Sequence, residues 1–94
     1  MKISAISTRK LRSLLLELGF SEERGKHHIF YYFRHEGKIV VRTRISHGAK
    51  EIGQPLLGLI GKQLKLERTD WERFLRGQLS REEYIHILRA RKLI

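Results

Sequence analysis

Two runs of aromatic and β-branched residues, separated by a turn that contains glycine, constrain the fold of this chain most. The first run is Ile29–Phe33 and the second extends from Ile39 to Ile45. Residues of these types favour β-strands. Between the runs lies His35-Glu36-Gly37-Lys38, and glycine at the second position of a two-residue turn is typical of a tight hairpin. The sequence therefore predicts an antiparallel β-hairpin near its centre.

Helical patterns lie on both sides of this hairpin. Ser7 or Thr8 can begin a first helix that ends at Gly19, because hydroxyl side chains cap helix N-termini and glycine ends helices well. Residues 20–26 are a short strand or a loop, and residues 46–54 are expected to be a loop. Pro55 suits the first turn of a second helix. The apolar residues that recur at helical spacing are Leu11, Leu14, Leu15 and Leu18 in the first helix and Leu56, Leu57, Ile60 and Leu64 in the second.

The last third of the chain, residues 67–94, is expected to be helical. Thr69 or Asp70 can cap one short helix, and Ser80 with Glu83 has the spacing of a capping box for another. Two interpretations fit the apolar residues of this tail: they extend the core, or they form an interface with another protein or with a second copy of the chain. These residues are Trp71, Phe74, Tyr84 and Leu88.

The charge balance points to a polyanionic partner. Twenty Lys and Arg residues against ten Asp and Glu residues give a net charge of +10, which favours nucleic acid first and an acidic protein second. Residues 1–66 have a net charge of +8 and residues 67–94 only +2. This distribution argues against a helix-turn-helix DNA-binding protein that would use the C-terminal helices.

Other classes of protein are disfavoured by what the chain lacks. It has no cysteine, so disulfides and thiolate metal sites are excluded. No apolar run approaches the ~18 residues of a membrane span, and Met1–Ala5 does not resemble a signal peptide. A cytoplasmic protein without cofactor, metal or membrane partner is therefore expected.

A two-residue turn would place His35 opposite Lys38 and divide the hairpin into two faces. The more apolar face is expected to cover the helices, and the more basic face is expected to bind a phosphate backbone with stacked bases. A three-residue turn would shift the register and bring His27 beside Ile45. The apolar face comprises His28, Phe30, Tyr32, Arg34, Ile39, Val41, Thr43 and Ile45; the basic face comprises His27, Ile29, Tyr31, Phe33, His35, Lys38, Val40, Arg42, Arg44 and Ser46.

Three histidines are candidate catalytic residues. Cleavage of RNA by its 2′-hydroxyl needs a group that accepts one proton and another that donates one, and histidine does both near neutral pH. His27 begins the first strand and His47 follows the second, so they should lie close together, with His28 beside them. The alternative is that these histidines are surface residues without catalytic function. A zinc site made of them is disfavoured, because adjacent strand residues point to opposite faces.

The order of these motifs resembles the HicA family of small mRNA-interferase toxins. The resemblance covers about residues 3–66. Its segments are Leu18-Gly19-Phe20, Gly25-Lys26-His27-His28-Ile29-Phe30, Gly37-Lys38-Ile39-Val40-Val41, Ser46-His47-Gly48 and Leu56 through Leu64.

The resemblance implies an α+β fold similar to the double-stranded-RNA-binding domain (dsRBD-like, α-β-β-β-α), a small antiparallel sheet with helices on one face. Residues 1–66 would form this domain, and residues 67–94 a C-terminal helical extension packed on it. It also implies a type II toxin–antitoxin system, with metal-independent endoribonuclease activity on mRNA and neutralisation by a HicB-type antitoxin. The family's catalytic histidine corresponds to His27.

Two departures from the family leave two hypotheses open. Residues 67–94 are longer than the compact family members need, and their apolar residues would either extend the core or form a homodimer or antitoxin interface. Lys26 stands where the family has serine, although a lysine can contact phosphate. The chain is either an endoribonuclease that uses His27 as general acid or base, with His28 and His47 as secondary candidates, or a non-catalytic RNA-binding module of the same fold. The residues expected to contact RNA are Lys26, Tyr31, Arg42, Arg44 and Lys50.

Overall fold

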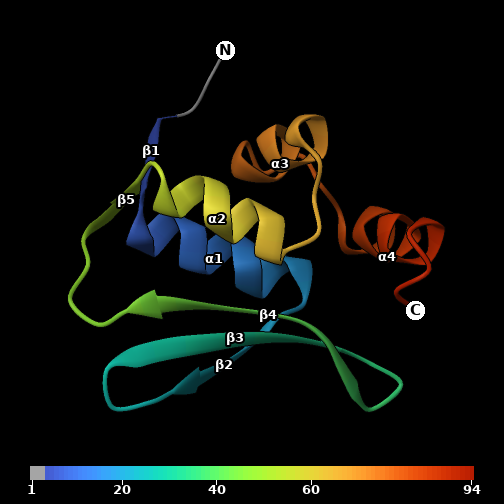
Figure 1. Cartoon of the computed structure of the whole chain (residues 1–94), viewed down its shortest axis with the longest axis horizontal. Coiled ribbons are helices and arrows are strands. Elements are labelled where there is room, and N and C mark those ends of the chain that lie inside the picture. Colours follow the sequence, from blue (N-terminus) through green and yellow to red (C-terminus); the bar gives the residue numbers. More distant parts are fainter. Residues whose placement is uncertain (1–3) are drawn as a thin grey trace.

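The computed structural model describes residues 4–94 and has the predicted α+β fold (Figure 1). The first three residues of the predicted 1–66 domain lie outside the described part. The elements are β1 (Ala5–Ser7), α1 (Thr8–Leu18), β2 (Ser21–Arg24), β3 (His28–His35), β4 (Lys38–Ser46), β5 (Glu51–Gly53), α2 (Leu56–Gln63), α3 (Arg68–Leu75) and α4 (Arg81–Ala90).

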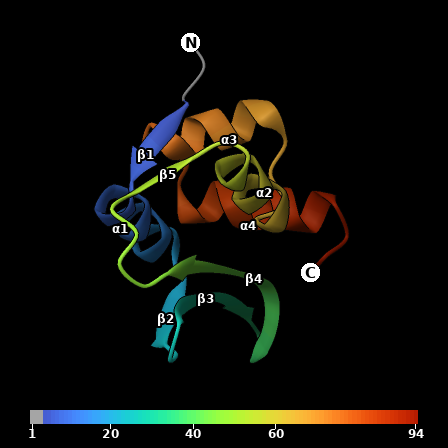
Figure 2. The same ribbon diagram turned by 60° about the vertical axis from the view of Figure 1, so that its left-hand side comes forward.

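Strands β2, β3 and β4 form an antiparallel sheet in that order. Helices α1 and α2 lie over one face of this sheet, and the elements of residues 4–94 leave the opposite face open (Figures 1 and 2). The succession α1-β2-β3-β4-α2 is the predicted α-β-β-β-α order. The sheet therefore has an inner face, covered by helices, and an outer face that is free to meet a ligand.

A second sheet, of strands β1 and β5, is absent from the sequence-based expectations. It pairs Ile6 with Ile52 and Ser7 with Glu51. Both isoleucines are buried, which gives the pairing its hydrophobic anchor. Each strand has three residues, too few for an alternating pattern to be read. Residues 51–53, expected to be loop, are thus tied to the segment that enters α1.

Helix α1 begins and ends as its sequence predicts. The Ser7 side chain accepts a hydrogen bond from the backbone N–H of Lys10, which satisfies an otherwise free donor of the first turn. Gly19 ends the helix with φ of 111°, in the left-handed region that glycine enters without strain. The helix buries Leu11, Leu14, Leu15 and Leu18.

The hairpin turn is predicted correctly, but the register beyond it is not. Glu36 and Gly37 form a two-residue turn with φ of 51° and 80°, and His35 faces Lys38. A β-bulge then follows: Arg34 pairs with Ile39, whereas Phe33 pairs with Val41, so Val40 has no partner of its own. An extra residue on one strand shifts its pairing with the other strand by one position. Side chains that an unbroken register would place on the same face of the sheet then lie on opposite faces.

Beyond the bulge, the sequence-based face assignment is right for β4 and wrong for β3. The buried side chains of β3 and β4 are Tyr31, Phe33, Val41, Thr43 and Ile45, whereas Phe30 and Tyr32 are only partly buried and Arg42 and Arg44 are exposed. The alternative register, with His27 beside Ile45, is also wrong, because Ile45 pairs with Ile29.

Tyr31 ties the sheet to α1. Its hydroxyl donates a hydrogen bond of 2.7 Å to a carboxylate oxygen of Glu22, which also accepts two from the Arg12 guanidinium. Burial raises the pKa of Tyr31, and the bond from Arg12 lowers the pKa of Glu22. The three groups form a satisfied polar cluster at the edge of the core.

The tail packs on α1 and shares its core. The side chains of Trp71, Phe74, Leu75, Tyr84 and Leu88 are buried in one cluster with the leucines of α1. The ring of Tyr84 meets that of Phe33 edge-on at 5.0 Å, and its hydroxyl donates to the backbone oxygen of Leu64. Of the two interpretations of the tail, these side chains therefore follow the first: they extend the core of a single chain and are not free for an interface.

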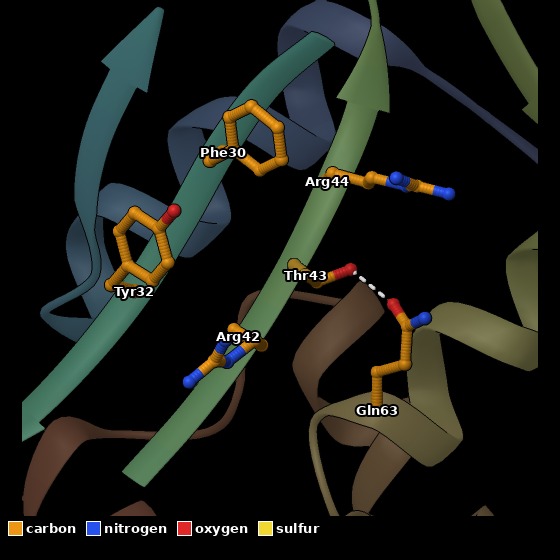
Figure 3. Close-up of a pocket in the computed structure, with 6 residues that line it drawn as sticks. All are labelled: Phe30, Tyr32, Arg42, Thr43, Arg44 and Gln63. Atoms are coloured by element: carbon orange, nitrogen blue, oxygen red, sulfur yellow. Dashed lines mark hydrogen bonds between the residues drawn. The ribbon is translucent and has the colours of Figure 1, made fainter. Parts of the chain in front are cut away.

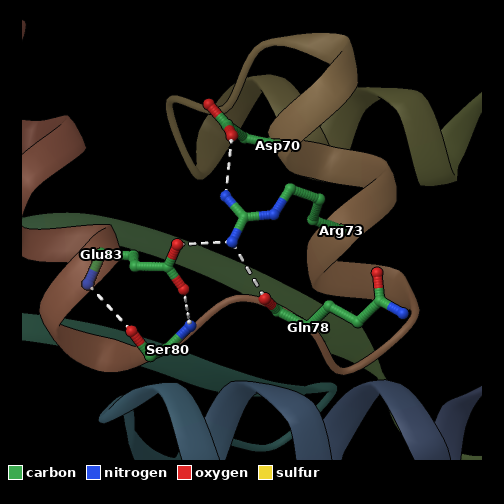
Figure 4. A network of polar contacts seen from close by, with 5 residues as sticks. All are labelled: Asp70, Arg73, Gln78, Ser80 and Glu83. Atoms are coloured by element: carbon green, nitrogen blue, oxygen red, sulfur yellow. Dashed lines mark hydrogen bonds and ion pairs between the residues drawn. The ribbon is translucent and has the colours of Figure 1, made fainter.

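A polar network joins α3 to the start of α4 (Figure 4). The Arg73 guanidinium bonds to Asp70, to Glu83 and to the backbone oxygen of Gln78. Ser80 and Glu83 form the predicted capping box, each accepting from the other's backbone N–H. The turn between the two helices is thereby held in place, which orients Tyr84 toward the sheet.

Candidate nucleic-acid interface

The outer face of the sheet carries two parallel aromatic rings among arginines. The rings of Phe30 and Tyr32, on β3, have centroids 6.3 Å apart and planes inclined by 9°. The guanidinium of Arg34 lies 5.4 Å from the centroid of the Tyr32 ring, within the range of a cation–π contact. We call this surface the aromatic face; its residues are Phe30, Tyr32, Arg34, Arg42 and Arg44. Figure 3 shows all of them except Arg34.

The two arginines of β4 complete this face. Arg42 is opposite Tyr32 and Arg44 is opposite Phe30, and both side chains line a shallow pocket of about 340 Å³ with the two rings, Thr43 and Gln63. Within residues 4–94, no ion pair neutralises Arg42 or Arg44. Their charges are available to an anion that meets the sheet.

Only some of the residues that were predicted to contact RNA lie on this face. Arg42 and Arg44 are exposed as expected, but Tyr31 is buried and cannot contact RNA. His28 opposes Ser46 and its ring lies 6.1 Å from that of Phe30, so His28 belongs to the arginine side. His27 precedes β3 in an exposed bend. The expectation that His27 shares the arginine face while His28 turns to the apolar side is therefore wrong.

The predicted proximity of His27 and His47 is confirmed. The backbone N–H of His47 donates to the backbone oxygen of His27 at 3.1 Å, and the His47 ring nitrogen Nε2 lies 2.8 Å from the backbone oxygen of Gly25. A carbonyl oxygen only accepts, so Nε2 carries the hydrogen of this bond. In the neutral ring, Nδ1 is then left as a proton acceptor.

A second concave surface lies between the start of α1 and the segment that follows β4. We call it the basic groove, with a volume of about 660 Å³. Its cations are those of Arg9, Arg12, Arg24, His47 when protonated, and Lys50, and its remaining lining residues are Ser7, Thr8, Ile29, Ser46, Gly48 and Ala49. Lys26, the remaining predicted RNA contact, is exposed in the bend beside His27.

Sequence reasoning missed three residues of the aromatic face and three cations of the basic groove. Phe30, Tyr32 and Arg34 were assigned to the apolar face, because that assignment depended on an unbroken register. Arg9, Arg12 and Arg24 were not connected with the site at all. Arg9 and Arg12 lie far from the hairpin ends in sequence and approach them only through packing, whereas Arg24 lies three residues before His27. The available signal was the position of Arg24 close to His27 in the sequence.

Comparisons with family models, curated proteins and solved structures find no match to this chain. Two further findings concern residues 4–94. No group of three histidine, aspartate or glutamate side chains is placed to hold a metal ion, and no helix is long and apolar enough to cross a membrane.

Proposed function

We propose that this protein binds single-stranded RNA on the aromatic face. The observation that carries the proposal is the pair of parallel rings, Phe30 and Tyr32, with Arg34, Arg42 and Arg44 around it. Unpaired bases stack on such rings while cations beside them meet the phosphates. Bases within a duplex are stacked on one another and do not offer their faces, so a single strand fits this surface better than a duplex.

The test is RNA binding by a variant in which Phe30→Leu and Tyr32→Leu are combined. Leucine keeps apolar bulk on the strand but lacks a stacking surface. Each stacked base contributes about 1–3 kcal/mol, so affinity for a labelled single-stranded RNA should fall by at least about tenfold in fluorescence anisotropy. Unchanged affinity in a folded double variant would disprove the proposal, as would a preference for duplex RNA of the same sequence.

Arg89→Ala is the matched control for the arginines of the face. Arg89 is an exposed arginine of α4, on an element that does not line either surface. Arg44→Ala should weaken RNA binding and reduce the salt dependence of log K by about 0.7 if Arg44 meets one phosphate. Arg89→Ala should change neither value.

The second candidate function is the HicA-type one: a toxin that cleaves mRNA without a metal and is neutralised by a HicB-type antitoxin. A specific observation favours it, namely that His27, His28 and His47 gather at one end of the sheet, where His28 faces Ser46 and His47 bonds to His27. One histidine would accept the 2′-hydroxyl proton and another would protonate the leaving 5′-oxygen. Nearby cations such as Arg44 would stabilise the negative charge of the transition state.

Cleavage of single-stranded RNA in EDTA tests this second candidate. His27→Ala is expected to lower the rate by about 10²–10⁴-fold, the usual contribution of a general acid or base. His28→Ala and His47→Ala identify the second group, and His86→Ala, in the exposed surface of α4, is the matched control. If all four variants cleave like the wild type, these histidines are not the general acid and base; if the wild type does not cleave, this second candidate function is wrong.

A further inference from the structure

We propose that the basic groove is a phosphate-binding site, separate from the aromatic face. Its ligand is a phosphate group, either free in a small molecule or within an RNA strand. The groove lies between the first turn of α1 and residues 46–50, at the end of the sheet where β4 finishes. The rings of Phe30 and Tyr32 do not line it, so the two surfaces can be tested separately.

The charges of the groove carry the proposal. Its lining contains no carboxylate. Arg12 is paired with Glu22, but within residues 4–94 no ion pair neutralises Arg9, Arg24 or Lys50. Glu22 also attracts Arg24, but the cations outnumber this carboxylate and repel one another, and a bound anion lowers the repulsion. Protonation of His47 would add a further positive charge.

Hydroxyl groups and the orientation of α1 favour phosphate over a smaller anion. Ser7, Thr8 and Ser46 line the groove, and hydroxyls are common donors to phosphate oxygens. The Thr8 hydroxyl oxygen is shielded from solvent and has no partner among the residues that the structure describes. The first turn of α1 has no acidic residue, so the positive end of the helix dipole adds to the attraction.

The groove and the aromatic face meet at Ser46. This residue lines the groove and lies two positions beyond Arg44 on β4. Two residues of a strand span about 7 Å, so an RNA strand that stacks on the aromatic face can place one phosphate in the groove. This second part of the inference rests on the proposed function, whereas phosphate binding itself does not.

Titration of the ¹⁵N-labelled protein with inorganic phosphate tests the site by NMR. At constant ionic strength, the amide signals of residues 7–9 and 46–50 should shift with phosphate but not with chloride. Arg24→Ala and Lys50→Ala should each weaken phosphate binding by about tenfold, since each removes a hydrogen bond between charged groups. Arg89→Ala, which removes the same charge from α4, should titrate like the wild type. Equal shifts with chloride, or wild-type titration of both groove variants, would overturn the inference.

RNA binding by the same variants separates this inference from the proposed function. If Arg24→Ala weakens both phosphate and RNA binding, the groove holds a phosphate of the bound strand. If it weakens phosphate binding alone, the site serves a free phosphate compound, and the part of the inference that concerns RNA is wrong. If phosphate binds in the groove but the Phe30→Leu, Tyr32→Leu variant binds RNA like the wild type, the proposed function fails and the phosphate site stands.

Discussion

Two adjacent tyrosines of β3 serve opposite purposes. Tyr31 is buried and bonds to Glu22, whereas Tyr32 lies on the outer face, parallel to Phe30 and beside Arg34. The alternation of a strand separates their surroundings within a single step of the chain. The sequence-based choice between the two tyrosines depended wholly on the strand register. This dependence explains why Tyr31 was expected to contact RNA although Tyr32 is the exposed one.

This contrast predicts different effects of two conservative substitutions. Tyr31→Phe removes one hydrogen bond to a charged group and should lower the free energy of unfolding by about 1–3 kcal/mol, with RNA affinity unchanged. Tyr32→Leu should weaken RNA binding and change stability by less than about 1 kcal/mol. Urea unfolding and fluorescence anisotropy measure the two quantities, and a loss of RNA affinity in Tyr31→Phe alone would contradict the assignment of faces.

Glu22 predicts a pH dependence of stability. Its pKa is lowered in the folded protein, chiefly by the hydrogen bond from Arg12, so its stabilising effect is present above the unfolded pKa of about 4.3. The effect is lost as the pH falls through the lower pKa of the folded state. Glu22→Gln should therefore destabilise the protein at pH 7, and the difference from the wild type should shrink toward pH 3. A constant difference in urea unfolding would exclude this linkage.

At the scale of elements, the sequence predicts the helices and the hairpin turn better than the sheet register. The caps at Ser7, Gly19 and Ser80 act locally, and so does the turn at Gly37. The bulge at Val40 does not, because alternate residues of Ile29–Phe33 are apolar or aromatic in either register. Packing against the helices selects one register, and a single strand sequence does not contain that information. Strands β1 and β5 were missed because each is defined by its partner alone.

The contact between α2 and α3 predicts different effects of alanine at two glycines of α2. A Cβ added to Gly61 would lie 2.9 Å from atoms of the Trp71 ring, whereas one at Gly58 would meet the side chain of Gln54, whose oxygen is nearest at 3.0 Å. Gly61→Ala should cost about 1–3 kcal/mol through overpacking. Gly58→Ala should cost at least about 1 kcal/mol less, since alanine favours the helix and Gln54 can move. Equal unfolding free energies of the two variants in urea would refute the close contact.

At the scale of the whole molecule, one core unites the two halves of the chain. Leucines of α1, Phe33 of the sheet and Tyr84 of the tail are buried in the same cluster. The charge, by contrast, is concentrated in residues 1–66. The sequence predicts this division of charge. It does not predict that the basic half depends on the tail, since apolar residues at helical spacing suit a core and an interface equally well.

Removal of the tail should therefore unfold the protein. A chain ending at residue 66 would expose apolar surface of Phe20 and Phe33, whose rings contact Tyr84 of the tail. The cost is about 25 cal/mol for each Å², in a domain already small for independent stability. We expect it to lack the dispersed amide signals of a folded protein in an NMR spectrum. Cooperative thermal unfolding of residues 1–66 would show instead that the tail is dispensable.

The short β1–β5 ladder has a consequence for how fast a ligand binds. It pairs Ser7 with Glu51, and the N–H of Thr8 donates to the backbone oxygen of Lys50 at 3.0 Å, so the two walls of the basic groove are joined before any phosphate arrives. Association then needs no closing motion, and charge attraction can bring its rate toward about 10⁸ M⁻¹ s⁻¹ at low salt. Substitutions within the groove should accordingly shorten the residence time of the ligand far more than they slow its arrival.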